Sequence, residues 1–195
     1  MTIRLSEGSV MAGNVVEDPV FRTRYRFTRS TAPGGGEVQH VEIWVDPGGG
    51  VPPHLHPSME ERFTVVAGRA ELLEGRRWRT AGPGETVVVP AGTRHAFRNR
   101  AEAVTHMRAE ARPPSTLQAF LEDVAGLSRA GKLTRPGLPR PNALLEAAVL
   151  AQHYRDMVTL LLPSPPPVVQ RLLFPPLARI AQQRGHRAGQ FATLA

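Results

Sequence analysis

The first 112 residues alternate short apolar segments with glycine and proline clusters, and this rhythm constrains the fold more than any other feature. Turn residues such as Gly48-Gly49-Gly50 and Gly82-Pro83-Gly84 separate segments rich in Val, Thr, Phe and Trp, which are residues 38–45, 63–67, 70–74, 86–89 and 104–110. Strands that recur roughly every eight to twelve residues are typical of a sandwich or barrel. We therefore predict a mainly β domain over residues 1–112.

The pattern changes from β to helical at Pro113-Pro114. Three helices are expected after it. The first starts with the capping box Ser115-Thr116-Leu117-Gln118 and ends before Gly131, because apolar residues recur after Leu117 at helical spacing. The other two are expected from Asn142 to about Leu162 and from Pro167 or Val168 to about Arg184. Residues 113–195 are interpreted as a helical extension of the barrel and not as an independent domain.

Proline and apolar side chains place two further constraints on the last two helices. The third helix must kink or break at Pro175-Pro176, because proline lacks the amide donor that an inner helical turn needs. Both helices are apolar over a wide arc that needs cover from the barrel, from each other or from a second subunit. The residues of this arc are Leu144, Leu145, Val149, Leu150, Tyr154, Met157, Val158, Leu161, Leu172, Leu173, Phe174, Leu177 and Ile180. We expect a homodimer, with contact to a membrane surface as a weaker alternative.

Composition excludes several kinds of site. The 195 residues include no cysteine, so disulfides, thiolate nucleophiles, iron–sulfur ligation and cysteine-based zinc sites are excluded. No apolar run reaches the roughly 18 to 20 residues of a membrane span. The start of the chain shows no secretion signal, so a cytoplasmic location is expected. Any metal must be held by histidine and carboxylate side chains.

The net charge of +7 raises the question of a nucleic-acid partner. Residues 1–112 carry 15 Arg against 13 acidic residues, and residues 113–195 carry nine basic against four acidic residues. No run of five or six consecutive basic residues exists, and Arg22, Arg24 and Arg26 alternate with aromatic residues as on the solvated face of a strand. We interpret the charge as a solvated surface and expect no nucleic-acid partner.

Three histidines and a carboxylate stand out as possible metal ligands. His54 and His56 are two residues apart, which on a strand places both imidazoles on one face. Glu61 begins the next apolar segment, and His95 comes from a different one. Three imidazoles and one carboxylate suit a single divalent Fe, Mn, Ni, Co, Cu or Zn ion and leave positions open for water, dioxygen or substrate. This is the pattern of a catalytic site, since a structural site is closed.

The spacing of these residues resembles the two sequence motifs of the cupin superfamily. The first motif is matched by Gly48, His54, His56, Glu61 and Gly68, and the second by Gly84, Pro90, Gly92, His95 and Asn99. The resemblance covers about residues 38–112 and says nothing of the helical extension. It implies a jelly-roll β-barrel with a metal inside one end, bound by His54, His56, Glu61 and His95. The matched glycines are read as turn residues.

The carboxylate position has an alternative, because the family also tolerates a shorter spacing that Glu60 would fill. Glu61 is preferred for two reasons: it lies six residues before Gly68, and it shares strand parity with Phe63 and Val65. Phe63, and Phe97 two residues after His95, are predicted to line a substrate pocket, although both also suit plain barrel core. His40, His106, His153 and His186 are expected to be surface or hydrogen-bonded residues.

Three functions remain open at this point. The leading hypothesis is a metal-dependent oxygenase, similar to the quercetinase-type dioxygenases, that acts on a small organic substrate, with Glu61 also taking a proton. The first alternative is a module that binds a small molecule without turning it over, either alone or as part of a regulator. The second is a metal-dependent isomerase or lyase. The barrel fold itself does not choose among them.

Overall fold

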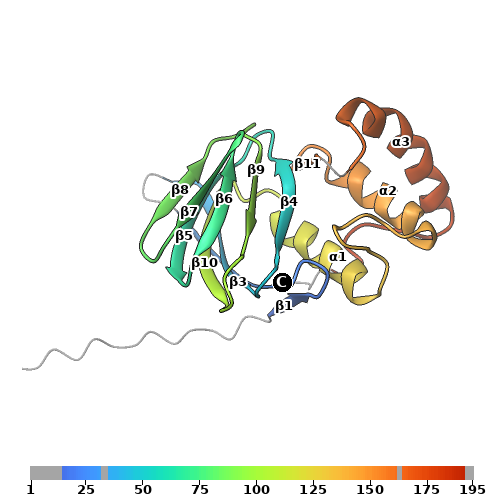
Figure 1. Ribbon diagram of the computed structural model, residues 1–195. Helices are drawn as coiled ribbons and strands as arrows, with labels where there is room; N and C mark the ends of the chain where they lie inside the picture. The colour runs from blue at the N-terminus through green and yellow to red at the C-terminus, as the bar shows by residue number, and fades with distance from the viewer. Residues whose placement is uncertain (1–14, 32–34, 162–163, 192–195) are drawn as a thin grey trace, which may run out of the picture.

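Two antiparallel sheets dominate the computed structural model, which describes residues 15–31, 35–161 and 164–191 (Figure 1). The first sheet has the order β1-β2-β3-β10-β5-β8. Its strands are β1 (Val16–Asp18), β2 (Thr23–Thr31), β3 (Glu37–Val45), β5 (Glu60–Ala67), β8 (Thr86–Val89) and β10 (Thr105–Arg112). The second has the order β11-β4-β9-β6-β7. Its strands are β4 (Gly50–Leu55), β6 (Ala70–Glu74), β7 (Arg77–Ala81), β9 (His95–Arg98) and β11 (Thr159–Leu160).

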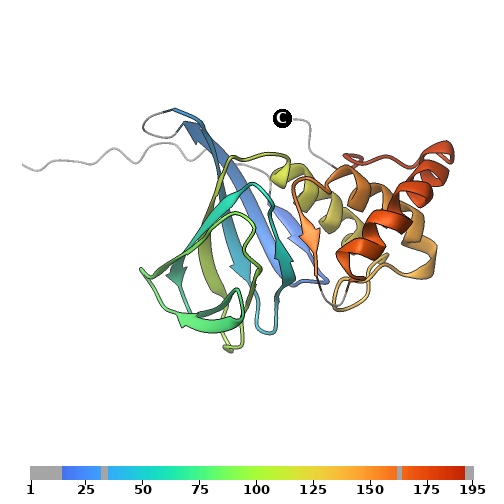
Figure 2. The same cartoon turned by 90° about the horizontal axis from the view of Figure 1, so that it is seen from above.

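The sheets face each other as a jelly-roll-like barrel, as seen from above in Figure 2. The mainly β fold predicted from the strand and turn rhythm is confirmed. Along β5, the side chains of Glu61, Phe63 and Val65 point into the barrel, and the residues between them face outward. Pleated strands place alternate side chains on opposite faces, so the parity of β5 places Glu61 inside the barrel together with Phe63 and Val65.

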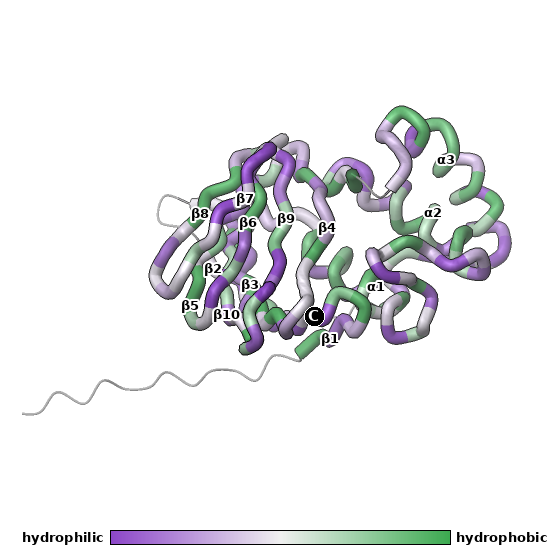
Figure 3. Tube along the Cα trace, in the orientation of Figure 1, coloured by the Kyte–Doolittle hydropathy of each residue, from purple (hydrophilic) through white to green (hydrophobic). Residues whose placement is uncertain are grey.

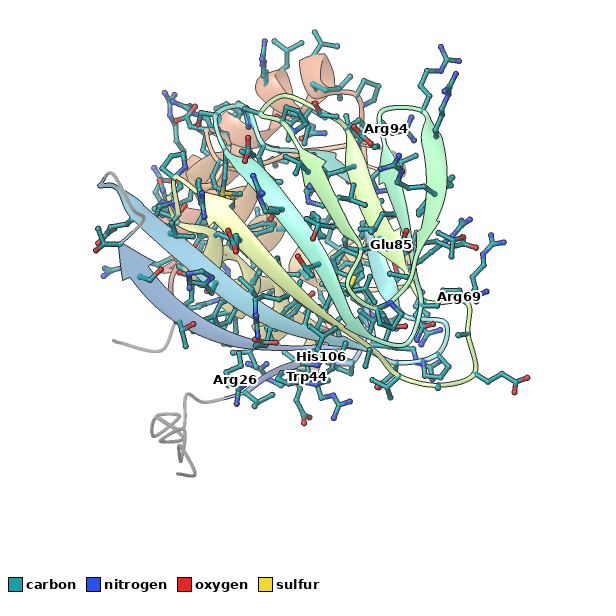
Figure 4. All side chains as sticks on the ribbon, turned by 90° about the vertical axis from the view of Figure 1, so that its left-hand side faces the viewer. Arg26, Trp44, Arg69, Glu85, Arg94 and His106 are labelled. Atoms are coloured by element: carbon teal, nitrogen blue, oxygen red, sulfur yellow. The ribbon has the colours of Figure 1, made fainter. Side chains whose placement is uncertain are left out.

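The outer face of the first sheet is polar, as the alternation of basic and aromatic residues predicted. Arg24 and Arg26 flank the buried Tyr25 on β2, whereas Arg22 lies before the strand with a positive φ of 54° and is not part of the alternation. Arg26 lies over the Trp44 ring, 5.5 Å from its centroid, and Trp44 stacks on His106 (Figure 4). Three neighbouring strands therefore contribute one stacked cluster on this solvated face.

The first helix of the tail is α1 (Leu117–Arg129), and its predicted capping box is wrong. The N-cap is Thr116, with no side-chain capping bond, so Gln118 lies at the second helical position and donates to Glu122 instead. Ser115 has a positive φ of 47° and lies before the N-cap, outside the helix. Gly131 follows the helix end with a φ of +66°, the left-handed conformation that helix ends favour for glycine.

The second helix is much shorter than predicted. A 3₁₀ turn (Pro141–Ala143) leads into α2 (Leu144–His153), and the helix does not continue to Leu162. The chain leaves the helix at Tyr154 and then forms β11, whose residues Thr159 and Leu160 pair with β4. The same apolar residues satisfy a helix or a strand, and here the free edge of β4 decided between the two.

The third helix, α3 (Pro167–Gln183), starts where the sequence predicted. It continues through Pro175 and Pro176, so no break occurs there. Two prolines remove backbone donors, but Ala178 and Ala181 bury the following turns against Val149 of α2 and stabilise the helix there.

The apolar side chains of the last two helices, which were expected to be covered, are only partly buried. Val149, Leu150, Tyr154, Met157 and Val158 are buried, but the face of α3 turned away from α2 exposes apolar side chains, and α3 has extended green stretches in Figure 3. The exposed ones on α3 are Val168, Leu172, Leu173 and Ile180, with Leu172 70% exposed, and Leu144 at the start of α2 is exposed as well. Within the described residues, no helix has the length and apolar character that crossing a membrane requires.

Candidate metal centre

The four predicted ligands meet inside one end of the barrel. His54 lies on β4, His56 follows that strand, Glu61 lies on β5 and His95 begins β9. His54 and His95 are direct partners in the β4–β9 register, with ring centroids 4.1 Å apart. One potential ligand atom from each of the four residues lies within 4.8 Å of all the others. The structure thus brings together residues from three strands and both sheets.

Backbone carbonyl groups orient all three imidazole rings. His54 Nδ1 donates to the Pro52 carbonyl at 2.9 Å, His95 Nδ1 to the Thr93 carbonyl at 2.9 Å, and His56 Nδ1 to the Met157 carbonyl at 2.8 Å. A carbonyl oxygen only accepts hydrogen bonds, so each Nδ1 carries the hydrogen. The opposite nitrogen, Nε2, is the atom that each ring can offer to a metal ion. Fixing the ring in this way is the usual role of outer partners in metal sites.

Glu61 is held as a carboxylate by its surroundings. Burial alone would raise its pKa, but the neighbouring His56 and His95 reverse this and hold the pKa well below its usual range. Burial would lower the pKa of His56, yet the charge of Glu61 raises it overall. For His54, burial and the two other histidines lower the pKa well below its ordinary value. His54 is therefore neutral at pH 7, and the lone pair of its Nε2 is free.

The polar atoms of the cluster do not satisfy one another, and a cation between them would. Glu61 Oε2 lies 2.8 Å from His95 Nε2 and 3.5 Å from His56 Nε2. Within the described part of the chain, Glu61 Oε2 and His95 Nε2 are nevertheless buried without a hydrogen-bond partner. Two facing acceptors are costly to bury unless something positive lies between them. His54, His56, Glu61 and His95 could therefore hold a divalent transition metal, and this donor set suits several ions.

The two adjacent carboxylates have different environments. Glu61 is 5% exposed and lies in the cluster, whereas the Glu60 side chain faces solvent and lies 3.7 Å from Arg62. The structure thus places Glu61 among the three histidines and Glu60 outside, as strand parity predicted. The difference also makes Glu60 a natural control for experiments on Glu61.

Phe63 and Phe97 lie together beside the cluster. Both are buried, their ring centroids are 5.9 Å apart, and the Phe63 ring is 6.2 Å from that of His95. They form an apolar wall next to the ligands, and their role in lining a substrate pocket stays a prediction. Arg94, adjacent to His95 in sequence, is exposed and points away from the barrel (Figure 4).

The other four histidines do not join the cluster. His40 bonds to Ser30, His106 to Glu42, and His186 lies 3.6 Å from Glu146. His153 is exposed and packs edge-on against Tyr154. Their predicted reading as surface or hydrogen-bonded residues agrees with these positions.

One contributor to the centre was missed by sequence reasoning. The Met157 carbonyl comes from the segment between α2 and β11 and lies 101 residues after His56 in the chain. A backbone acceptor leaves no trace in residue identity, so no sequence signal could have identified it.

Comparison with known proteins shows what the barrel is similar to. A family model described as a cupin domain matches residues 41–107. A search of curated proteins found no match. Among solved structures, the polyketide cyclase RemF from Streptomyces resistomycificus is 29% identical, with 57% of this chain and 79% of that chain covered and a TM-score of 0.43.

Two other solved structures are similar over comparable lengths. KdgF from Halomonas sp. is 18% identical, with 53% of this chain and 90% of that chain covered and a TM-score of 0.45. A sugar phosphate isomerase of the cupin superfamily from Silicibacter pomeroyi is 22% identical, with 53% and 66% covered and a TM-score of 0.42. Similarities of this extent carry no argument about substrate or reaction.

Proposed function

We propose that this chain, in which residues 41–107 match a cupin-domain model, is a metal-dependent cupin oxygenase of the quercetinase-like dioxygenase type. Its substrate would be a small organic molecule. The observation that carries the proposal is the convergence of three imidazole Nε2 atoms and one carboxylate oxygen inside the barrel. Four protein ligands leave one or two positions of an octahedron open, as a catalytic centre requires.

Each ligand has a defined task in this proposal. When bound, the ion would supply a Lewis acid toward oxygen atoms of the substrate. His54, His56 and His95 would hold the ion with rings already oriented by carbonyl groups, so little reorganisation accompanies binding. Glu61 would be both a ligand and the base that takes a proton from the substrate.

The base role of Glu61 requires movement of its carboxylate. Beside His56 and His95 its pKa lies well below the usual range, which makes the carboxylate a poor proton acceptor near neutral pH. A carboxylate that turns away from the two rings loses these neighbours and becomes more basic. We propose that the proton is taken in this turned position.

The surroundings of the ligands favour an uncharged or weakly acidic substrate. Phe63 and Phe97 would exclude water from one side of the ion. Among the described residues, no Arg or Lys side chain is buried, so a phosphate group would find no enclosed cation beside the ligands. This observation favours an oxygenase over an isomerase that acts on sugar phosphates.

We further propose that residues 113–195 are an extension of the barrel and not an independent domain. In support, β11 adds a strand to the second sheet beside β4, and the Ser128 hydroxyl of α1 donates to the buried Asp18 of β1 at 2.6 Å. Figure 1 shows β11 between the barrel and the α2–α3 pair.

Oxygen consumption tests the proposed activity. The metal-loaded protein should consume dioxygen and form an oxygenated product with at least one member of a panel of flavonols, diketones and small acids. Glu61→Gln should lose at least about 100-fold in turnover, because general-base catalysis alone contributes roughly 10²–10⁴-fold. Glu60→Gln is the matched control and should keep full turnover.

Three other outcomes would contradict an oxygenase. Turnover without dioxygen consumption would indicate the isomerase or lyase. Saturable binding of a panel compound without turnover would indicate a non-catalytic binding or regulatory module. A purified protein that binds no transition metal would remove the basis of both metal-dependent activities.

A homodimer is our proposal for the exposed apolar side chains of α3. Val168, Leu172 and Leu173 are each more than half exposed, and burying such side chains against a second copy would be favourable. Light scattering at micromolar concentration should give twice the mass of the 21.3 kDa chain, and Leu172→Glu should give the single mass. A wild-type protein of single mass would refute the dimer.

A further inference from the structure

The helical tail reaches the candidate metal centre directly. The carbonyl of Met157 accepts the Nδ1–H of His56 at 2.8 Å, and both residues are buried. Three residues later, Leu160 pairs with His54 in the β11–β4 register, and the Leu161 amide donates to the Pro53 carbonyl at 3.1 Å. The tail segment 157–161 therefore runs alongside β4, the strand that carries His54 and leads to His56. The cupin match ends at residue 107, so this contact is an addition to the barrel.

A tight turn sets the position of the Met157 carbonyl. The amides of Met157 and Val158 both donate to the Tyr154 carbonyl at 2.9 Å, directly after α2 ends. Residues 154–158 therefore act as one unit: if Tyr154 shifts, the acceptor of His56 shifts with it.

A buried carboxylate holds Tyr154 by its hydroxyl group. Tyr154 is 1% exposed, and its hydroxyl donates to Asp123 Oδ2 of α1 at 2.9 Å. Asp123 is fully buried, and its two oxygens also accept the amides of Gly189 and Phe191 from the segment after α3. Asp123 thus joins α1, the turn after α2 and the C-terminal segment at one point.

The hydroxyl and the ring of Tyr154 make different contacts. The ring packs against Phe120, with centroids 5.3 Å apart, and against His153. Phenylalanine would keep this packing and lose only the bond to Asp123. If Tyr154 served only to fill the core, removal of its hydroxyl would leave His56 unchanged. The chain of bonds from Asp123 through Tyr154 to Met157 predicts instead that this removal changes the hydrogen bond of His56.

We propose that Tyr154 is a positioning residue for the metal centre. Its bond to Asp123 holds the turn 154–158 so that the Met157 carbonyl keeps His56 in the Nδ1–H tautomer, with Nε2 directed toward Glu61. The proposal rests on the proposed metal site and extends it to the tail. It makes the tail part of the centre rather than an appendage, since loss of an outer partner of a ligating histidine weakens metal binding.

Tyr154→Phe tests this proposal, with Ser128→Ala as the matched control. Both changes remove one buried hydroxyl of the tail, but the Ser128 hydroxyl bonds to Asp18 and to the Val20 amide and contacts neither Asp123 nor the turn 154–158 through a hydrogen bond. The probe is Co²⁺, whose visible spectrum reports its ligand geometry. We expect Tyr154→Phe to bind Co²⁺ about 10-fold more weakly, the lower end for loss of an outer partner, with an altered spectrum. Ser128→Ala should bind as the wild type does.

A second measurement uses the metal-free protein. At a pH high enough for the His56 ring to be neutral, long-range ¹H–¹⁵N NMR spectra should show His56 as the Nδ1–H tautomer in the wild type and in Ser128→Ala, and a mixture of tautomers in Tyr154→Phe. Unchanged Co²⁺ affinity together with an unchanged His56 tautomer in Tyr154→Phe would overturn the proposal. Equal weakening of Co²⁺ binding by Ser128→Ala would also overturn the proposal, because general loosening of the tail would then be enough to explain the effect of Tyr154→Phe. If the wild type binds no Co²⁺, the proposed metal site fails on that result, and the tautomer still decides the role of Tyr154.

Discussion

Glu61→Gln is expected to weaken the binding of a divalent transition metal by more than about 100-fold, since loss of even an outer partner costs roughly 10–100-fold. The substitution removes the negative charge that lies 2.8 Å from His95 Nε2 and 3.5 Å from His56 Nε2. It also leaves an amide where the cluster needs a carboxylate. His54→Ala and His95→Ala should lower affinity by a similar factor, because each removes one Nε2 from the set.

Glu60→Gln provides the control for this result. It makes the same chemical change one residue away, on a side chain that faces solvent beside Arg62, and should leave metal affinity within about a factor of two. The measurement is elemental analysis of protein purified without a chelating tag, followed by titration with competing chelators. Equal loss in both variants, or metal content unchanged in His54→Ala, would show that the ion is bound elsewhere.

Gly50→Ala is expected to reduce the free energy of unfolding by roughly 3–5 kcal/mol, the combined size of backbone strain and overpacking. A Cβ at this position would lie 2.3 Å from the Phe97 carbonyl oxygen and 2.7 Å from Arg98 Cα. Gly50 pairs with Arg98 in the antiparallel β4–β9 ladder, and its φ is +146°. Backbone atoms cannot move aside as the end of a flexible side chain can, so the two strands must separate.

Gly84→Ala separates steric overlap from backbone conformation. Gly84 also has a positive φ of 84°, but nothing lies within 4 Å of a Cβ built there. We expect this variant to lose only about 1–2 kcal/mol, the cost of a left-handed conformation for alanine. Urea unfolding of the metal-free proteins measures both values. Equal losses would mean that the close approach of β4 and β9 does not constrain Gly50.

Strand positions were predictable from sequence because turn chemistry and two-residue alternation are local properties. Residues 70–74 and 86–89 form strands with the predicted bounds, and the first tail helix is present within two residues of its expected limits. Helix ends were less predictable. The apolar run after Leu144 suits a helix as far as Leu162, and only pairing with β4 turned part of it into a strand. Such pairing is decided between segments that are distant in sequence.

The ligand cluster could be anticipated from strand alternation for three of its members and from the resemblance to the cupin motifs for the full set with His95. Alternation places His54 and His56 on one face and selects Glu61 over Glu60, and the structure has this arrangement. What holds the rings could not be anticipated, because their acceptors are the backbone carbonyls of Pro52, Thr93 and Met157. The backbone of every residue offers the same carbonyl acceptor, so the sequence does not distinguish one carbonyl from another.

The sequence by itself determined a mainly β domain, a set of metal-ligating residue types without cysteine, and the parity that sends one carboxylate inward. These follow from local geometry and from chemistry that belongs to single side chains. Tertiary structure alone decided that the tail would supply a strand to β4 and a hydrogen-bond acceptor to His56 across 101 residues of chain. The physical reason is that a free strand edge and an unpaired imidazole N–H must both be satisfied, and only the folded chain determines which distant segment satisfies them.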